Sequence, residues 1–346
     1  MLAYLVKRLA LAVVLFLALS LVTYIIFFVI PQDPTRFGRG AAVQLVDVRE
    51  TVNLTAKDPF YVEYGRFVWR VVHKFSLGHS YASRREVRDI VLTAAPVTAS
   101  LVLGGAIVWM LIAIPLGILS ALRPRSLLDR VLSMFVLLGI SAHPVWIGLI
   151  ADYLLGFKLR LMPLSGYCDM FNPSGRCGGP LQWTYHLLLP WIAFAVLYAA
   201  LYMRMIRANV LETMQEDYVL AARAKGASEF RIMRSHVLRN AMLPVVTMLG
   251  MDISIALGGS VFIEQVYGLP GLGRTAIVAL NRGDLPVLLG VIVFVTVAIV
   301  VVNLLLDLFY AWIDPRVHVH QRGSEVELKT SARRDLPTPA VAAEPG

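Results

Sequence analysis

The chain of 346 residues contains 58% hydrophobic and 16% charged residues and has a mean hydropathy of +0.68. One soluble core of this size cannot enclose so much apolar surface, so the composition excludes an ordinary soluble domain and predicts a membrane protein. The net charge of +9 does not indicate a nucleic-acid partner, because the basic residues form short runs beside apolar stretches without interleaved aromatic side chains. Two cysteines provide neither a disulfide scaffold nor a zinc site of four ligands.

Six apolar stretches satisfy the length of roughly 20 residues that a helix needs to cross a bilayer. They lie near residues 9–30, 97–122, 128–156, 184–203, 243–263 and 286–312. The first is longer than the apolar region of a signal peptide, and no small-x-small cleavage site precedes Pro31, so we expect it to remain as an anchor. The sequence therefore predicts an all-α, polytopic membrane protein with six transmembrane helices.

Basic residues set the predicted orientation of these spans. They precede the first span and fill the second and fourth connections, where Arg123 and Arg207 are examples. The positive-inside rule places those sides and both termini in the cytoplasm. Residues 31–95 then form a large extracytoplasmic loop; they carry ten Lys or Arg against seven Asp or Glu, but long translocated loops follow the rule weakly.

The chain divides into four predicted regions. Residues 1–30 contain the N-terminal region and the first span, and residues 31–95 contain the outside loop. Residues 96–316 form a five-helix core. Residues 317–346 mix charges with proline and lack apolar periodicity, so we expect a disordered cytoplasmic tail.

Residues 204–241 form a basic, water-compatible segment between two apolar spans. The helix of the fourth span is expected to continue to Gly226, with Lys225 in its last turn. The apolar residues that continue it are Ile206, Val210, Met214 and Val219. Ser228 is placed to cap a second helix, with Glu229 in its first turn. The apolar face of that second helix contains Phe230, Met233 and Val237.

Small residues lie beside this glycine corner. Ala221, Ala222 and Ala224 have almost no side chain, which permits a partner surface to approach closely. The alternative is an ordinary amphipathic connector between two spans.

Several motifs resemble those of the inner-membrane permease subunits of ATP-binding-cassette importers for peptides and nickel. Leu220-Ala221-Ala222-Arg223-Ala224-Lys225-Gly226 resembles their EAA signature, with Leu220 in place of the Glu. His236-Val237-Leu238-Arg239-Asn240-Ala241 and Pro244 resemble the version found in peptide permeases. Further similar segments are Pro31-Gln32-Asp33-Pro34, Arg160 to Tyr167, Val266 to Gly273 and Asp314-Pro315-Arg316.

This resemblance implies a subunit of the bacterial plasma (inner) membrane that has no enzyme activity and no cofactor of its own. ATP and Mg²⁺ would belong to two cytoplasmic ATPase subunits or domains. The other implied partners are a second homologous permease and an extracytoplasmic substrate-binding protein. Coupling to the ATPase is assigned to Ala221, Ala222, Arg223, Ala224, Lys225 and Gly226.

Peptides are the expected cargo, and nickel, glutathione or haem is the alternative within the same family. A passive channel or an intramembrane enzyme is a remote alternative. The chain contains no H-E-x-x-H, no G-x-S-x-G and no convincing acid pair within the spans, which argues against hydrolysis.

Residues 268–275 have the spacing of a nucleotide-binding phosphate loop, with Arg274 in place of the Lys. A phosphate loop requires a preceding strand and cytosolic ATP, whereas this stretch follows a membrane span on the predicted outer side. We therefore interpret it as a tight extracytoplasmic turn. Its candidate residues for docking the binding protein are Gly268, Pro270, Gly271 and Gly273.

Asp252 is the strongest candidate for the translocation path, because an intramembrane charge costs about 2.5–3.5 kcal/mol and usually faces a cavity or a partner. Ser254 and His143 are weaker candidates, and His143-Pro144 is interpreted as a candidate kink or gate element in the third span. The small residues around Ser254 also suit helix packing, and His143, before Pro144, is also explained by a hydrogen bond to a freed backbone carbonyl.

Both cysteines, Cys168 and Cys177, fall in one predicted outside loop. A disulfide that closes the eight-residue interval is sterically reasonable in an oxidising medium, and two free thiols are the alternative. No metal site is predicted, because His186 lies too near the membrane face to be assumed as a third ligand.

Overall fold

The computed structural model describes residues 77–171 and 177–313, with side chains up to residue 306, and short pieces within 10–25 and 61–69. Most of the first predicted span, most of the loop after it, the segment Asp314-Pro315-Arg316 and the predicted tail therefore lie outside the described residues. In chain order the elements are α4 (Val87–Leu122), α5 (Leu127–Ser141), α6 (Pro144–Ala151), the π-helix η3 (Asp152–Lys158), α7 (Pro180–Thr213), α8 (Asp217–Ala224), α9 (Glu229–Ile232), the π-helix η4 (Met233–Val237), α10 (Leu238–Ala241), α11 (Leu243–Val266), α12 (Leu272–Arg282) and α13 (Leu285–Ile313).

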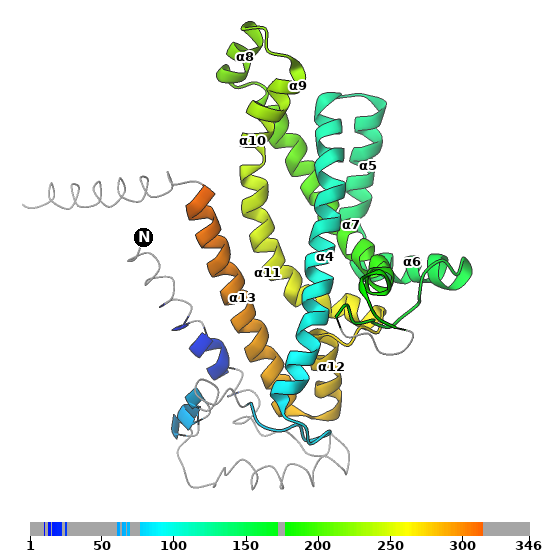
Figure 1. Ribbon diagram of the computed structural model, residues 1–346, viewed down its shortest axis with the longest axis vertical. Helices are drawn as coiled ribbons and strands as arrows, with labels where there is room; N and C mark the ends of the chain where they lie inside the picture. Colours follow the sequence, from blue (N-terminus) through cyan, green and yellow to red (C-terminus); the bar gives the residue numbers. More distant parts are fainter. Residues whose placement is uncertain are drawn as a thin grey trace, which may run out of the picture.

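Helices α4 and α7 form the centre of the bundle and pack closely along their lengths (Figure 1). Trp109 of α4 is fully buried and its ring stacks on Tyr198 of α7, with the centroids 4.5 Å apart. Small residues permit this approach: a Cβ added at Gly105 would lie 2.7 Å from the ring of Phe194. The core of the described bundle is therefore an aromatic and glycine interface between these two helices.

Helices α11 and α13 complete the bundle, and α12 joins them at the end opposite α8 and α9 (Figure 1). Gly283, with φ of +67°, ends α12 in the left-handed conformation. The next residue, Asp284, is 4% exposed and accepts hydrogen bonds from the Ser80 hydroxyl at 2.5 Å and the Tyr81 N–H at 3.1 Å. These bonds attach the segment before α4 to the start of α13.

The third predicted span, 128–156, is not one straight helix. It consists of α5 followed by α6 and η3, and the two parts are bent by 104°. Pro144 has no N–H to donate and disfavours helical backbone at the residue before it, so His143 is extended, with φ −68° and ψ 136°. Four described helices are long and apolar enough to cross a membrane, or five if this bent pair is one span.

Two other boundaries differ from the sequence-based expectation. Helix α4 begins at Val87, earlier than residue 97, because Val87 and Val91 are buried in an apolar cluster with residues of α13 that stabilises the polar first turn. Helix α7 ends at Thr213 and is followed by a turn. The predicted continuous helix from the fourth span to Gly226 is therefore wrong.

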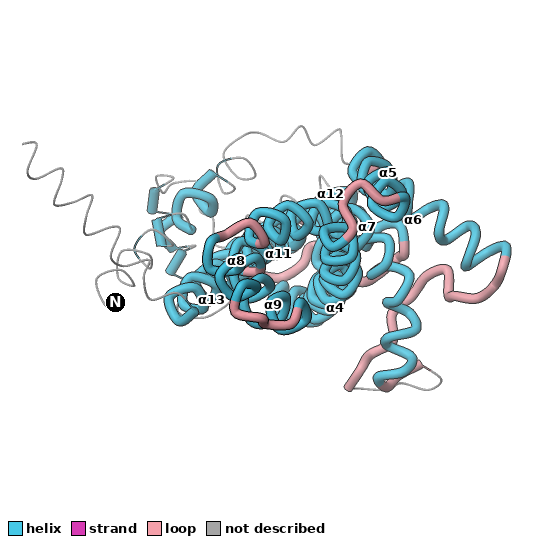
Figure 2. The backbone as a smooth tube through the Cα atoms, turned by 90° about the horizontal axis from the view of Figure 1, so that it is seen from above, coloured by secondary structure: helices cyan, strands magenta, loops and turns pink. Residues whose placement is uncertain are grey.

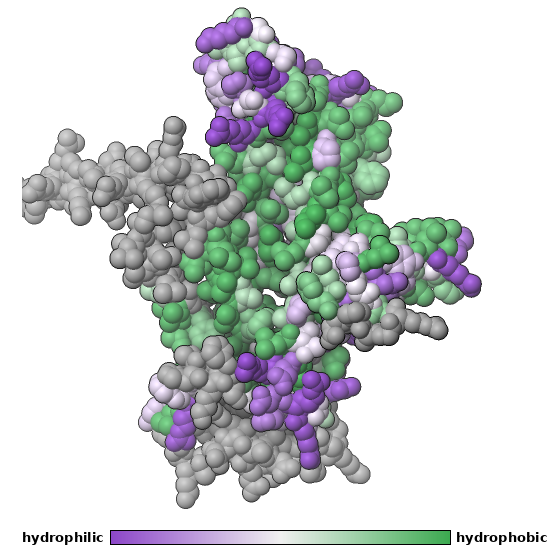
Figure 3. Space-filling model, in the orientation of Figure 1, coloured by the Kyte–Doolittle hydropathy of each residue, from purple (hydrophilic) through white to green (hydrophobic). Residues whose placement is uncertain are grey.

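The face of the molecule shown in Figure 3 has hydrophilic side chains at its two ends and a largely apolar band between them. The band includes large exposed side chains such as Met134 and Phe135, which are 64% and 69% exposed. Lipid is the solvent that suits such a surface. Seen from above, α8 and α9 lie over one end of the bundle of α4, α7 and α11, and α6 lies at its side (Figure 2).

Candidate coupling and translocation sites

The predicted glycine corner is present between α8 and α9. Gly226 has φ of +79°, in the left-handed region that favours glycine. Its N–H donates to the carbonyl of Arg223 at 3.0 Å, and the N–H of Ala227 donates to the carbonyl of Ala222 at 3.2 Å. This pair of bonds is the Schellman arrangement, which satisfies the last carbonyls of a helix before a sharp change of direction.

The six residues of the predicted coupling motif form an open surface at this corner. Only Ala222 is half-buried, where it packs against the core; the others are exposed. A Cβ added at Gly226 would meet nothing within 4 Å. The corner therefore presents small and basic groups at the end of the molecule, in the hydrophilic region of Figure 3.

An ion pair crosses the corner. The guanidinium of Arg223 donates to both carboxylate oxygens of Glu229, from Nε at 2.7 Å and from Nη2 at 3.1 Å. These bonds lower the pKa of Glu229 and raise the pKa of Arg223. Both side chains are solvent-exposed, so the pair orients the two short helices more than it stabilises them. The sequence reasoning missed it, although the two residues flank the corner glycine.

Apolar residues seat the corner on the bundle. Val219, Ile232 and Val237 are at most 1% exposed and belong to the same buried cluster as α7. Phe230 does not share this face, since it is 76% exposed. Ser228 occupies the N-cap position of α9, but its side chain makes no capping hydrogen bond. The predicted cap and the predicted three-residue apolar face are thus corrected.

The three path candidates contact different elements. The carboxylate of Asp252 accepts a hydrogen bond from the Tyr202 hydroxyl of α7 at 2.6 Å. The hydroxyl of Ser254 lies 3.0 Å from the side-chain oxygen of Asn303 of α13. Asp252 and Ser254, both on α11, therefore contact two different neighbouring helices: Asp252 contacts α7 and Ser254 contacts α13.

His143 lies at the bend between α5 and α6. Its Nδ1 accepts a hydrogen bond from the Val145 N–H at 3.3 Å, which caps α6, and its ring meets Phe262 edge-on at 5.6 Å. The expected bond to a freed carbonyl is therefore replaced by a bond to a free N–H at the start of a helix.

The glycine-rich turn is occupied by a carboxylate of the chain itself. Glu264 is fully buried; its Oε1 accepts from the Thr98 hydroxyl at 2.6 Å, and its Oε2 accepts from the Arg274 N–H at 2.9 Å. The Leu272 N–H donates to the Thr98 oxygen at 2.8 Å. The N–H groups at the start of α12, which would hold a phosphate, thus have internal partners, and a helix precedes the turn.

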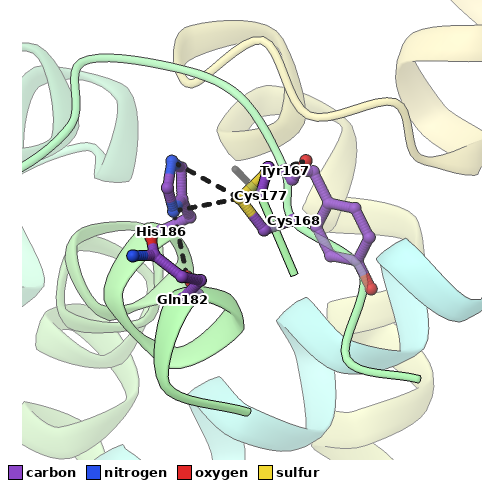
Figure 4. The surroundings of a disulfide bond; sticks show 5 residues. All are labelled: Tyr167, Cys168, Cys177, Gln182 and His186. Carbon is purple, nitrogen blue, oxygen red and sulfur yellow. Dashed lines mark hydrogen bonds between the residues drawn. A yellow bond between two sulfur atoms is a disulfide. The ribbon is translucent and has the colours of Figure 1, made fainter. Parts of the chain in front are cut away.

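The predicted outside loop that contains Cys168 and Cys177 (the second) and the glycine-rich turn that follows α11 (the third) lie together. Cys168 and Cys177 are joined in a disulfide, and the ring of His186 stands beside the sulfur of Cys168, with Nδ1 at 3.4 Å (Figure 4). The Gly166 N–H donates to the carbonyl of Tyr267, in the third loop, at 3.3 Å. Among the described residues, no group of three His, Cys, Asp or Glu side chains is arranged to hold a metal.

A second ion pair that the sequence does not predict lies near the C-terminal end of α7, where the half-buried Arg207 meets the buried Asp129. The sequence places Arg207 in the basic connection and assigns no role to Asp129. In the structure they form a two-point contact. The sequence does contain one sign of the pair: Asp129 is an acidic residue at the start of the predicted span 128–156, where a basic partner is expected.

Comparison with known proteins assigns the family. The profile described as binding-protein-dependent transport system inner membrane component matches residues 113–319. The profile of the N-terminal part of this membrane component matches residues 1–102. The chain belongs to this family. Each profile covers one part of the chain, and together they span nearly all of it before the predicted tail.

Curated members of this transport family align over almost their full length. A putative peptide transport system permease protein of Brucella suis is 34% identical over 320 residues, which cover 92% of this chain and 99% of the relative. The dipeptide transport system permease protein DppB of Escherichia coli is 32% identical over 338 residues, covering 92% and 99%. The inward-facing MetNI methionine ABC transporter matches with a TM-score of 0.51 and 16% identity, over 65% of this chain and 96% of that chain. This last likeness shows a shared fold.

Proposed function

We propose that this protein is a permease subunit of an ATP-binding-cassette importer and forms half of a translocation path for dipeptides or oligopeptides. The observation that carries this proposal is the alignment of 92% of the chain with permeases named for peptides and dipeptides. In this function the chain has no catalytic group and binds no nucleotide. ATP and Mg²⁺ act in two separate ATPase subunits or domains, and a second homologous permease supplies the other half of the path.

The α8–α9 end faces the cytoplasm in this proposal. The turn between α4 and α5 lies at the same end of the bundle as α8 and α9 (Figure 1). Arg123 and Arg130 belong to or adjoin that turn, and Arg231 lies in α9. A concentration of basic side chains at one end is typical of the cytoplasmic side of a membrane protein. The α12 end, with the disulfide loop and the glycine-rich turn, then faces the substrate-binding protein, and both termini are cytoplasmic.

The glycine corner is the contact with the ATPase in this proposal. Its six residues project from the bundle, and apolar residues behind them join it to the core. Closure of the ATPase around ATP would move the corner, and differential affinity of ATP for two states of the complex would supply the driving force.

Asp252 is assigned to the path. It lies within α11, and its carboxylate accepts a hydrogen bond from the neutral hydroxyl of Tyr202. An intramembrane carboxylate of this kind usually faces a cavity or a partner. Ser254 and His143 accompany it as secondary candidates on the same path.

Reconstitution tests the proposal directly. The permease, its homologous partner, the ATPase and the binding protein are placed in proteoliposomes, and uptake of labelled di- and oligopeptides is measured with and without ATP. ATP-dependent peptide uptake, unchanged by excess nickel, glutathione or haem, is expected. Uptake of one of these competitors in place of peptides would reassign the cargo, and transport without ATP would indicate a channel.

A further inference from the structure

The carboxylate of Asp129 is saturated with hydrogen bonds from three parts of the chain. Its Oδ1 accepts from the Ser120 hydroxyl at 2.5 Å and from Nε of Arg207 at 2.8 Å. Its Oδ2 accepts from the Arg125 N–H and from Nη2 of Arg207, both at 2.9 Å. Asp129 is 5% exposed. The side chain of Asp129, at the start of α5, therefore connects the end of α4, the turn between α4 and α5, and the C-terminal part of α7.

The local backbone is shaped for this contact. Ser126 caps α5 by accepting the N–H of Asp129 at 3.2 Å. Arg125 has φ of +63°, a conformation that a non-glycine residue adopts at a cost. This strained turn directs the Arg125 N–H at the carboxylate, so the turn between α4 and α5 and the ion pair support one another.

On the other side, α7 is packed into the same body as the glycine corner. Ile206 and Val210, which flank Arg207 on α7, are fully buried in the cluster that contains Val219 of α8. The side-chain amide of Asn209 donates to the carbonyl of Ala241 in α10 at 3.2 Å. A displacement of the corner would therefore carry this part of α7 with it.

A purely stabilising role explains the pair poorly. The Asp129 carboxylate is buried and loses its hydration, which costs free energy, whereas the Arg207 side chain stays 32% exposed, so that solvent weakens the attraction between the two charges. A two-point guanidinium–carboxylate contact does fix the distance and the angle between two elements, which apolar side chains that slide past one another do not. The contact between Arg207 and Asp129 therefore holds α7 at a fixed distance and angle from the start of α5.

We propose that Arg207 and Asp129 are positioning residues that transmit motion of the glycine corner from α7 to α4 and α5. This inference rests on the proposed importer function. Breaking the pair would leave the ATPase able to bind the corner and hydrolyse ATP. Each cycle of hydrolysis would, however, displace α4 and α5 less. The coupling between hydrolysis and transport is thus the quantity that depends on this contact.

The test measures cargo transported per ATP hydrolysed in the reconstituted complex with Arg207→Gln and with Asp129→Asn. The matched control is Arg130→Gln, which removes the same charge from an exposed residue next to Asp129. We expect each test variant to lower the ratio by about two- to thirtyfold, the size of effect that is typical of residues along a coupling network. The control should keep the wild-type ratio.

Two further variants show whether the effect belongs to the pair. The double variant Asp129→Asn with Arg207→Gln should be no worse than the worse single variant, because one contact is lost in all three. Arg207→Lys keeps the charge but lacks the planar fork, and it should give an intermediate ratio.

Three results would overturn the inference. The ratio could stay at the wild-type value, hydrolysis and transport could fall in proportion, or neither Arg207→Gln nor Arg207→Lys could assemble, in which case the pair serves folding. Failure of the wild-type complex to couple peptide uptake to ATP would instead contradict the proposed function itself.

Discussion

The carboxyl group of Glu264 fills the space beside Gly271, where an added Cβ would lie 2.3 Å from the carboxyl carbon. The same carboxyl group bonds to Thr98 of α4 and to the backbone of Arg274 in α12. The turn between α11 and α12 is therefore closed around a buried acid, and glycine is required because a side chain and the acid cannot occupy one space.

Gly271→Ala is expected to destabilise the protein by about 1–3 kcal/mol, because the methyl group overlaps Glu264 and forces the turn to open. Gly258→Ala in α11 is the matched control, since its added Cβ meets nothing within 4 Å; it should change stability by less than about 1 kcal/mol. Thermal unfolding of both purified variants measures the difference. Equal midpoints would contradict the packing described for this turn.

Gly226→Trp is expected to abolish uptake while leaving assembly intact or modestly weakened, because the indole would fill the space that the ATPase occupies. Gly226→Ala is the control for backbone strain: the left-handed conformation costs about 1–2 kcal/mol for either side chain, but the methyl group adds little bulk. Uptake and co-purification of the ATPase are measured together. Undiminished transport by the Trp variant would refute the coupling assignment.

The fold was predictable to the level of apolar helices and their approximate ends. The stretches near 243–263 and 286–312 correspond to α11 and α13, because uninterrupted apolar sequence has no alternative to a long helix in lipid. A kink at His143-Pro144 was one of two interpretations of the sequence, but a bend as large as 104° was not predicted. Proline inside an apolar stretch is compatible with either a kinked or a broken span, and only packing decides between them.

The candidate sites were predictable only where a local rule applied. Gly226 follows from the need for a left-handed residue at a helix end. Arg207 and Asp129 are 78 residues apart in the chain, and no periodicity in one sequence reveals such a partner. The buried position of Glu264 was likewise missed, since a Glu at the end of a span is more typical of a solvated interface.

The pKa of Glu229 should lie below its ordinary value of 4.5, because the carboxylate accepts two hydrogen bonds from Arg223. A lowered pKa means that the pair supports the corner at pH values above 4.5 and that this support is lost as the pH falls through the lowered value. Titration of ¹³C-labelled glutamate, assigned with Glu229→Gln, measures it. Arg223→Gln should return the pKa to the ordinary range, and an unchanged value in that variant would contradict the ion pair.

A cysteine at position 57 should react with a membrane-impermeant thiol reagent added outside intact cells. The proposed orientation places the loop that contains Lys57 on the side opposite the basic connections. The experiment uses Lys57→Cys with Cys168→Ser and Cys177→Ser, and Arg130→Cys as the cytoplasmic control, which should react only after permeabilisation. Reaction in the reverse order would invert the topology and remove the ATPase from reach of the corner.

The disulfide between Cys168 and Cys177 should protect both thiols from alkylation until the protein is reduced. The two residues are nine apart in sequence. Closing a loop of this size lowers the conformational entropy of the unfolded chain and stabilises the folded protein by about 2–3 kcal/mol. Cys168→Ser with Cys177→Ser should therefore lower the unfolding midpoint, and mass spectrometry should show two alkyl groups on the native chain only after reduction. Because the Gly166 N–H bonds to the carbonyl of Tyr267, loosening this loop should also loosen the glycine-rich turn. Alkylation of both thiols before reduction would show that the loop is held by its hydrogen bonds alone.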